Sequence, residues 1–167
     1  MLEFLYPKIY VKNLEAVPYE KLKKKGITAL IFDIDNTLVP FDIPEATREI
    51  IDYLDNLQKM GFKICLLSNN KKERVDEFNR ILGLSAVHKA KKPRKKGIEQ
   101  ALKLLDAKET ETAIIGDQIF TDVWGGNRKG LVTILVKPVS TRDEFTVVLK
   151  RGVERLVIKS FVRHAKK

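Results

Sequence analysis

The feature of this sequence that most constrains its fold is a short apolar run that ends abruptly in carboxylates. Residues 29–32 read Ala-Leu-Ile-Phe, and Asp33, Asp35 and Thr37 follow at alternate positions. A buried strand that ends in this way brings both carboxylates to the carboxyl edge of a sheet, where open α/β folds bind ligands. Asp33 and Asp35 would point the same way if extended, and they would repel each other without a cation. The pair therefore favours a hard metal with oxygen ligands, although an acidic loop is the plainer interpretation of this motif alone.

Two later apolar runs end in polar groups of the same kind. The first covers residues 64–67 and the second covers residues 112–115. Ser68 and Asn69, a hydroxyl and a carboxamide, follow the first run. Lys92 lies between the two runs, and a second pair of carboxylates, Asp117 and Asp122, follows the second run. Each predicted strand thus ends in groups that can hold a phosphate or a metal.

This order of motifs resembles the four motifs of the haloacid dehalogenase (HAD) phosphatase superfamily. The resemblance implies an α/β fold, a Rossmannoid three-layer sandwich with a parallel sheet of about five strands. It also implies a phosphomonoester hydrolase that works through an aspartyl-phosphate, with Mg²⁺ as cofactor. Asp33 would be the nucleophile, and Asp35 the general acid and later the general base. The Asp33 carboxylate, the Asp35 backbone carbonyl and the Asp117 carboxylate would bind the metal.

The other motif residues are expected, by the same resemblance, to bind phosphate or to support the site. Hydroxyl, amide and ammonium groups would contact the phosphate oxygens, supplied by Thr37, Ser68, Asn69 and Lys92. Asp122 would orient a water at the metal or the lysine of the third motif. Ser68 could instead cap the helix that follows it. Lys91 competes with its neighbour Lys92, but the Lys-Pro pairing of the family pattern favours Lys92.

Strand and helix patterns alternate along the chain, which predicts a parallel sheet covered on both faces. Asp42 as cap and Pro44 in the first turn would begin a helix that Gly61 ends. The other expected elements are, in chain order, a strand at 63–67, a helix near 71–82, a short strand at 86–88, a helix around 98–105, a strand at 112–116, a short helix near 121–128 and a strand at 132–136. We expect one domain over residues 1–167, with an N-terminal extension over 1–26 and a C-terminal helix over about 142–167.

The spacing of the motifs leaves no room for a cap domain, which HAD enzymes often insert beside the first or second motif. Thirty residues separate Thr37 from Ser68, and twenty-three separate Ser68 from Lys92. Each gap suffices for one helix and one strand. An open site suits a substrate whose bulk cannot be enclosed, such as a lipid head group at a bilayer, a nucleic-acid end, a large saccharide or a protein.

Nearly the whole chain resembles one capless branch of the superfamily, subclass IIIA, the YqeG-type HAD proteins. The similar segments are residues 7–11, residues 18–26, Gly116 to Asp122, and residues 133–136 followed by Pro138. That branch is similar to the mitochondrial phosphatidylglycerophosphatase. The resemblance implies that the substrate is phosphatidylglycerophosphate and the product phosphatidylglycerol, so the partner would be an anionic phospholipid head group.

The net charge of +10 is concentrated in two segments. Residues 88–97 carry six positive charges and no negative ones, and residues 142–167 carry a net charge of +5. Both segments favour an anionic partner, although a merely solvated basic face is an equal explanation for the tail. Read as a helix, residues 145–165 place six apolar side chains along one broad side: Phe145, Leu149, Val153, Leu156, Val157 and Phe161. Arg151, Arg155 and Lys159 fall on another side, so the helix either docks on the domain or lies in a membrane interface.

The composition excludes several classes of protein. No apolar run is long enough to span a membrane, and the N-terminus lacks the blocks of a signal peptide, so we expect a cytoplasmic protein, peripheral on the inner membrane face if the tail binds lipid. Cys65 is expected in the core, and the two histidines are isolated, which argues against zinc.

Two alternatives to the lipid phosphatase stay open. One is a HAD phosphatase acting on a soluble sugar phosphate or a nucleic-acid 3′-phosphate. The other is a non-catalytic nucleic-acid-binding protein that uses residues 89–96. That role leaves the carboxylates unexplained, and no aromatic residues interleave with the basic run, so nucleic acid is not the expected partner.

Overall fold

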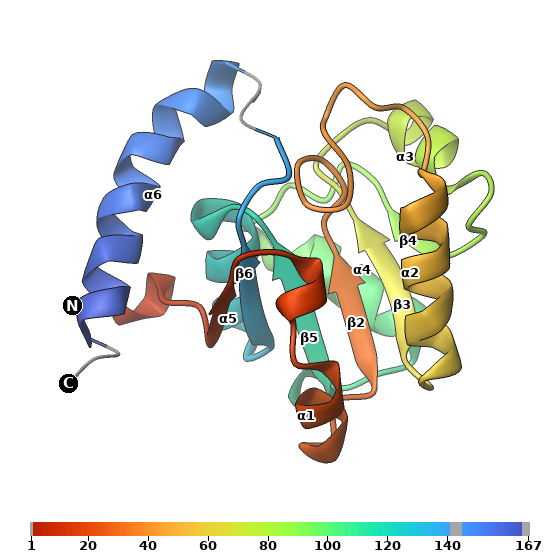
Figure 1. The fold of residues 1–167 in the computed structure, drawn as a ribbon, viewed down its shortest axis with the longest axis horizontal. Helices are drawn as coiled ribbons and strands as arrows, with labels where there is room; N and C mark the ends of the chain where they lie inside the picture. Colours follow the sequence, from red (N-terminus) through yellow and green to blue (C-terminus); the bar gives the residue numbers. More distant parts are fainter. Residues whose placement is uncertain (1, 141–144, 165–167) are drawn as a thin grey trace.

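Six parallel strands form one sheet, in the order β1-β6-β5-β2-β3-β4 (Figure 1). The structure, a computed structural model, describes residues 2–140 and 145–164, and only the backbone of residues 145–151. The strands are β1 (Ile9–Val11), β2 (Ala29–Phe32), β3 (Lys63–Leu67), β4 (Ser85–Val87), β5 (Thr112–Gly116) and β6 (Val132–Val136). The strand order switches direction beside β2, so the carboxyl ends of β2, β3 and β5 meet at one edge of the sheet, where open α/β folds bind ligands.

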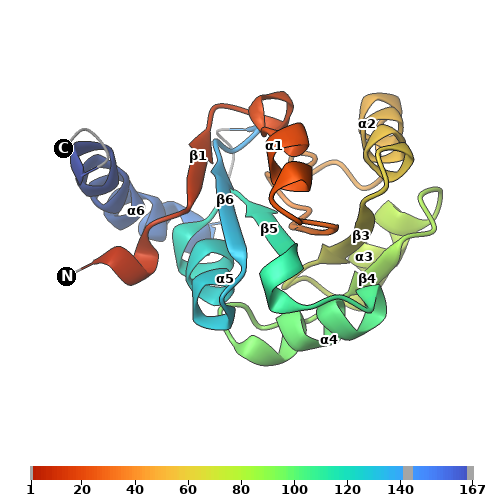
Figure 2. The ribbon, with the colours of Figure 1, turned by 90° about the horizontal axis from the view of Figure 1, so that it is seen from below.

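Helices cover both faces of this sheet and give three layers (Figure 2). The α-helices are α1 (Tyr19–Lys24), α2 (Arg48–Lys59), α3 (Lys72–Asn79), α4 (Lys95–Leu105), α5 (Trp124–Lys129) and α6 (Phe145–His164). Short helical turns lie at η1 (Glu3–Leu5), η2 (Leu14–Ala16), η3 (Glu109–Glu111) and η4 (Ile119–Val123), of which η4 is a π-helix. In Figure 2, α1 and α2 lie on one side of the sheet and α4 and α5 on the other. The expected three-layer α/β sandwich is confirmed.

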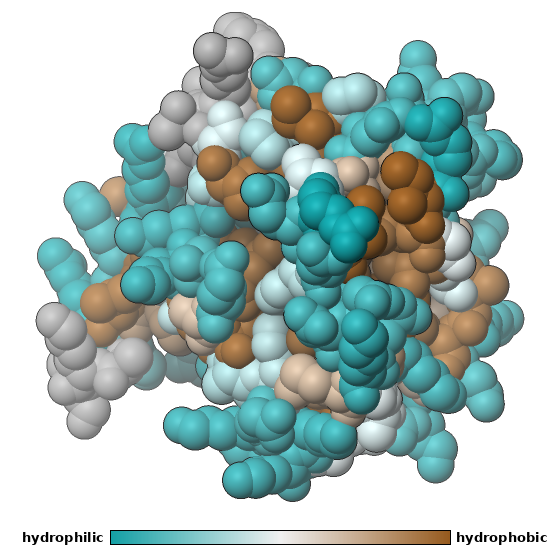
Figure 3. Space-filling view, turned by 45° about the vertical axis from the view of Figure 1, so that its right-hand side comes forward, coloured by the Kyte–Doolittle hydropathy of each residue, from teal (hydrophilic) through white to brown (hydrophobic). Residues whose placement is uncertain are grey.

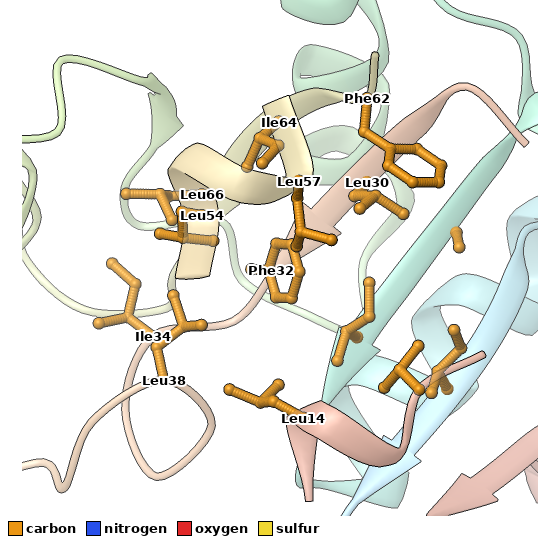
Figure 4. Close-up of a cluster of buried hydrophobic side chains, with 14 of the residues drawn as sticks. Leu14, Leu30, Phe32, Ile34, Leu38, Leu54, Leu57, Phe62, Ile64 and Leu66 are labelled. Atoms are coloured by element: carbon orange, nitrogen blue, oxygen red, sulfur yellow. The ribbon is translucent and has the colours of Figure 1, made fainter. Parts of the chain in front are cut away.

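The central strand explains why the sheet is covered on both sides. β2 is buried along its whole length, and its successive side chains point to opposite faces. Leu30 and Phe32 pack with Leu54 and Leu57 of α2 (Figure 4), whereas Ile31 joins the cluster formed with α4. Each such side chain contributes about 1.5–3 kcal/mol when it leaves water, so both helical layers stabilise the strand that carries the first motif.

The sheet has one strand more than expected, because residues 9–11 pair with β6 at its outer edge. This strand has three half-buried residues, too short for an alternating pattern to stand out in the sequence. The segment taken as an extension therefore builds part of the sheet.

Two predicted helices differ clearly from the structure, and a third, expected near 71–82, ends at Asn79. The helix expected from Asp42 and Pro44 begins after Thr47, whose side chain accepts a hydrogen bond from the backbone N–H of Ile50. Residues 40–46 instead form a loop whose Pro44 carbonyl accepts a hydrogen bond from Arg74 of α3. The helix near 121–128 is divided into the π turn η4 and α5, because two successive backbone N–H groups donate to the carbonyl of Gln118.

The structure describes all of residues 38–91, and no cap domain is inserted there between the motifs, as expected. The chain between Thr37 and Ser68 forms only α2 and β3 with their loops, and the chain from Ser68 to Lys92 forms only α3 and β4. Figure 3 shows one face of the molecule, on which hydrophilic residues predominate and hydrophobic residues emerge between them. None of the helices in the described ranges is long and apolar enough to cross a membrane.

Helix α6 packs against the β1 edge of the sheet and the N-terminal segment (Figures 1 and 2). Val157 is buried in a cluster with Leu5, Ile119 and other residues, and the hydroxyls of Tyr6 and Ser160 lie 2.6 Å apart. Helix α6 of the tail therefore docks on the domain in this structure. The single apolar side predicted for the tail is split, because Val153 and Leu156 face solvent while Val157 faces inward. The predicted side chains of Phe145, Leu149 and Arg151 lie outside the described residues.

Candidate active site

A lysine and two carboxylates form a buried cluster at the carboxyl ends of β2 and β5. The Nζ atom of Lys92 lies 2.5 Å from Asp33 Oδ1 and 2.7 Å from Asp122 Oδ1. The side chains of Lys92 and Asp122 are each 2% exposed, and that of Asp33 is 9% exposed. Buried charges are strongly unfavourable unless they are paired and hydrogen-bonded. The fold therefore holds these three groups in one arrangement.

Backbone contacts fix the lysine of this cluster. Asn69 follows β3, and its Oδ1 accepts a hydrogen bond of 2.6 Å from the backbone N–H of Lys92, while its Nδ2 donates to the Lys92 carbonyl. Both polar atoms of Asn69 thus bind the backbone of Lys92, so its described contacts position the lysine. Lys91 is exposed and has no contact with the carboxylate cluster among the described residues, so Lys92 is the lysine that contacts it.

A glycine and the π turn fix Asp122. Its Oδ2 accepts hydrogen bonds from the backbone N–H of Gln118 at 3.2 Å and from the Thr121 hydroxyl at 3.3 Å. A β-carbon at Gly116 would lie 2.3 Å from the carboxyl carbon of Asp122, which is too close for any side chain. Gly116 is therefore required for the carboxylate of Asp122 to lie against the end of β5. Both oxygens of Asp122 are engaged, which suits a supporting role.

The hydroxyl of Thr37 lies between the carboxylates of Asp33 and Asp117. Its Oγ1 is 3.2 Å from Asp33 Oδ2 and 3.1 Å from Asp117 Oδ1, and a single hydroxyl proton can serve only one of them at a time. Asp33, Asp117 and Asp122 each offer an oxygen, and these oxygens all lie within 4.8 Å of one another. A set of convergent carboxylate oxygens is what a hard cation such as Mg²⁺ requires, so these residues fit a divalent metal.

The environment shifts the pKa values of the central pair. Burial raises the pKa of Asp33 well above the usual carboxyl range, the Asp122 and Asp117 carboxylates raise it further, and the Lys92 ammonium lowers it. Burial lowers the pKa of Lys92, but the carboxylates of Asp122 and Asp33 outweigh burial and raise it above the ordinary lysine value. Lys92 is therefore charged at neutral pH, and a cation beside Asp33 would favour the ionised carboxylate that a nucleophile needs.

Asp35 lies apart from this cluster. Its Oδ1 accepts hydrogen bonds from Nε and Nη2 of Arg74 at 3.2 and 2.9 Å, and Asn70 contacts its other oxygen at 3.5 Å. The side chains of Asp33 and Asp35 thus contact different cations, Lys92 for one and Arg74 for the other. The Asp35 side chain is 22% exposed, so it lies at the open edge of the site.

Ser68 is nearly fully buried at the end of β3, the strand that pairs with β2. Its Oγ accepts a hydrogen bond of 3.0 Å from the backbone N–H of Asn70, so it fixes the turn rather than capping α3, which begins after Lys71. Accepting that bond leaves the hydroxyl proton able to donate to a phosphate oxygen.

Two residues of the site were missed in the sequence. Arg74 has other cations close by in the sequence, Lys72 in the same helix and Lys71 just before it. Only its position one turn before the inward-facing Phe78 distinguishes it, since its guanidinium lies over that ring. Glu154 is a buried carboxylate in the basic tail, and its Oε1 accepts hydrogen bonds from the backbone N–H groups of Ile119 and Phe120 at 2.8 and 3.2 Å. No local signal in the sequence predicts that contact, because the two segments are far apart in the chain.

Comparisons with known proteins agree with this geometry. A family model described as mitochondrial PGP phosphatase matches residues 2–140. The chain is 39% identical over 161 residues to the probable phosphatase YqeG of Bacillus subtilis (strain 168), covering 96% of this chain and 94% of that protein. It is 29% identical over 174 residues to phosphatidylglycerophosphate phosphatase 1, chloroplastic/mitochondrial, of Arabidopsis thaliana, covering 96% of this chain and 49% of that protein.

Solved structures share the fold at low sequence identity. A HAD-superfamily hydrolase from Ehrlichia chaffeensis superposes with a TM-score of 0.54 at 17% identity, covering 80% of this chain and 98% of that one. The cobalt-bound deoxy-D-mannose-octulosonate 8-phosphate phosphatase of Haemophilus influenzae gives a TM-score of 0.50 at 17% identity, covering 57% and 61% of the two chains. These likenesses support the three-layer fold with its parallel sheet.

Proposed function

Since the chain belongs to the mitochondrial PGP phosphatase family within the HAD phosphatases, we propose that it hydrolyses the terminal phosphate of phosphatidylglycerophosphate and releases phosphatidylglycerol. The observation that carries this proposal is the buried contact of Lys92 with Asp33 and Asp122, beside Asp117 and at an edge without a cap. A phosphoryl group there would meet a carboxylate nucleophile and a fixed ammonium, at an edge that no cap domain covers.

In the proposed mechanism Asp33 attacks the phosphorus, and a new bond from its carboxylate forms as the bond to the glycerol oxygen breaks. Asp35 gives a proton to that leaving oxygen. Water then attacks the aspartyl-phosphate while Asp35 takes its proton, and inorganic phosphate leaves with Asp33 restored. Asp35 must release Arg74 to reach the leaving group, and its exposed position favours this movement.

The transition state spreads negative charge over the phosphoryl oxygens, so cations must surround it. Lys92 is fixed at Asp33 and would contact one of these oxygens, with Thr37 and Ser68 as hydroxyl donors. A Mg²⁺ ion held by the Asp33 and Asp117 carboxylates and the backbone carbonyl of Asp35 would neutralise further charge. Asp122 would keep Lys92 in place through the contact already described.

In the same proposal the enzyme meets its lipid at a membrane surface through the outer side of α6. The side chains of Val153 and Leu156 are 52% and 65% exposed, and the exposed Lys159 lies one turn further along the helix. Apolar and cationic side chains together favour shallow binding to an anionic lipid surface. Replacing Leu156 with Glu should reduce sedimentation with vesicles of phosphatidylglycerol, and unchanged sedimentation would contradict this contact.

The test is phosphate release from phosphatidylglycerophosphate in mixed micelles, with and without Mg²⁺, for the wild type and Asp33→Asn. We expect release by the wild type that needs Mg²⁺ and stops in chelator, and none by the variant. Circular dichroism and thermal unfolding would confirm that the variant is folded, because asparagine keeps the shape of aspartate. Equal phosphate release by the variant would overturn the covalent mechanism.

The substrate is tested separately from the chemistry. Cleavage of an aryl phosphate that depends on Asp33, without any release from the lipid, would keep the phosphatase and contradict the lipid substrate. Soluble sugar phosphates and 3′-phosphorylated oligonucleotides would then be the next substrates to assay.

A further inference from the structure

A cavity of about 340 Å³ lies beside the active site, between the carboxyl ends of β5 and β6 and helix α6. Asp117 of the candidate metal site forms part of its wall, so the cavity and the carboxylate cluster adjoin. This volume is at the lower end of the range for small-ligand sites. It is therefore large enough for part of a substrate whose phosphate lies at Asp33.

Most of the cavity wall is apolar. The buried side chains of Ile119 and Leu135 form part of its lining, together with the half-buried Tyr10 and Ile158. Polar groups gain little binding free energy from such walls. Hydrocarbon that is buried against them gains about 25 cal/mol for each Å² of its surface removed from water.

Two exposed cations line the cavity as well. Lys137 directly follows β6, and Arg155 lies on α6. Neither forms an ion pair with another residue that the structure describes. They come from segments that are not adjacent in the chain, so their convergence results from the docking of α6.

The two carboxylates of the cavity are already engaged. Glu154 accepts hydrogen bonds from two backbone N–H groups of η4, and Asp117 is within hydrogen-bonding distance of the Thr37 hydroxyl at the candidate metal site. A carboxylate held by backbone donors is stabilised where it lies and competes weakly for other cations. Lys137 and Arg155 are thus left to attract an anion from outside.

We propose that this cavity binds the part of the substrate that is not cleaved: Lys137 and Arg155 contact a second phosphate, the phosphodiester of a glycerophospholipid, and the apolar walls contact its glycerol and the first carbons of its acyl chains. The proposal rests on the proposed function and adds to it a reason for the choice of substrate. A phosphomonoester on glycerol that also carries a phosphodiester matches a carboxylate–lysine cluster next to a cationic, apolar cavity. An aryl phosphate or a simple sugar phosphate would leave the cavity unused.

The experiment compares three substrates in solution. They are a short-chain phosphatidylglycerophosphate below its micelle concentration, the deacylated form with both phosphates, and an aryl phosphate with neither diester nor acyl chains. The variants are Lys137→Gln, Arg155→Gln and Ile158→Ala. Arg163→Gln is the matched control, since it changes an exposed arginine of the same helix that does not line the cavity.

For each cation variant we expect kcat/KM to fall about 10- to 100-fold on the two substrates that carry a phosphodiester as well as a phosphomonoester. The loss should appear mainly in KM, as for a lost charge-assisted hydrogen bond. Activity on the aryl phosphate should stay within about twofold. Ile158→Ala should lower kcat/KM several-fold on the acylated substrate alone. The control should match the wild type on all three substrates.

The outcomes separate this proposal from the one it rests on. If the wild type hydrolyses the lipid and the cation variants do so equally well, the cavity is not a subsite. If the variants lose activity on all three substrates alike, the cavity supports the catalytic residues and the subsite is refuted. If the wild type cleaves only the aryl phosphate, the lipid substrate itself is wrong, and the subsite is refuted with it.

Discussion

The carboxylates of Asp33 and Asp35 lie two residues apart in the loop after β2, and each pairs with a cation from elsewhere in the chain. The two pairs differ in how far they are exposed to water. Lys92 and Asp33 have side chains that are 2% and 9% exposed, and Lys92 also contacts Asp122. Arg74 and Asp35 have side chains that are 14% and 22% exposed. The first pair belongs to a network of buried groups, and the second lies at the rim.

This difference matches the work proposed for each carboxylate. A nucleophile must stay aligned with the phosphorus, and buried, hydrogen-bonded charges cannot move without losing their partners. A residue that exchanges protons with the leaving group and with water must change partners during each turnover. The half-buried pair of Arg74 and Asp35 should cost less to open than the buried pair, because salt bridges that water can reach contribute about 0–1 kcal/mol.

The largest effect should come from Lys92→Met, which leaves Asp33 and Asp122 buried without their cation. We expect kcat to fall by about 10³-fold or more, as when a member of a catalytic unit is removed, and the free energy of unfolding to fall by about 3–5 kcal/mol. Phosphate release and urea unfolding measure the two quantities. Lys91→Met is the control, because Lys91 is exposed and should change neither by much. A similar loss in both variants would mean that the buried contact is not what matters.

A smaller loss is expected for Gly116→Ala, which introduces a β-carbon 2.3 Å from the Asp122 carboxyl carbon. The carboxylate must move, so Lys92 loses one of its two partners without any change of charge. We expect activity to fall about 10²-fold and stability by about 1–3 kcal/mol. Gly152→Ala is the matched control, since its β-carbon meets nothing within 4 Å and alanine favours the helix. Full activity of Gly116→Ala would show that the position of Asp122 is not critical.

Mutations in the half-buried pair of Arg74 and Asp35 should have a weaker effect. Arg74→Met should lower kcat by about tenfold, because Asp35 loses the cation that holds it at the site between proton transfers, while stability changes by about 1 kcal/mol or less. Arg74→Lys should recover part of the activity. The exposed helical pair of Arg48 and Asp52 offers a control, and Arg48→Met should leave turnover unchanged. If Arg74→Met proved as damaging as Lys92→Met, the contrast between the two pairs would fail.

The smallest effect concerns Cys65 of β3, which pairs with Ile31 beneath the site. Burial raises the pKa of its thiol from the ordinary value to about 12, so the folded protein holds this proton where the unfolded chain releases it. Its contribution to stability is complete below pH 9 and is lost between pH 9 and pH 12. Wild type should therefore lose about 1 kcal/mol more than Cys65→Ala between pH 8 and pH 10 in urea unfolding. Equal losses would mean that the thiol ionises in the folded state as readily as in the unfolded chain.

Much of the fold could be predicted because its signals are local. The strands at 63–67, 112–116 and 132–136 were expected at the positions observed, since continuous apolar runs that end in polar groups are typical of buried parallel strands. Parallel strands end at the same edge, so the convergence of the motif side chains followed from the strand assignment. The strand at 9–11 could not be predicted, because its pairing with β6 depends on residues more than a hundred positions away.

The candidate site was predictable to the same extent. The buried positions of Asp33, Lys92, Asp117 and Asp122 agree with the expected motifs, whereas their proposed roles await the experiments above. The partner of Asp35 could not be predicted, because Arg74 competes in the sequence with neighbouring cations such as Lys71 and Lys72. The contacts that select Arg74 are tertiary, with the Asp35 carboxylate and the Pro44 carbonyl of the loop after β2, and local propensity does not contain them.

The contact of Glu154 with the amides of η4 also has a consequence for the order of events during folding. Ile119 and Glu154 are 35 positions apart, and Tyr6 and Ser160 are 154 positions apart. Closing longer loops costs more entropy, and contacts between distant segments slow folding. The strands β2 and β5 themselves pair across 83 positions, and α6 docks on η4, β6 and the N-terminal segment, so its docking surface exists only after the sheet has formed. A chain made from its N-terminus would contain every proposed catalytic residue before it contains the helix that steadies the Asp117 loop, so we expect secondary structure to form first and full activity to follow as a later kinetic phase.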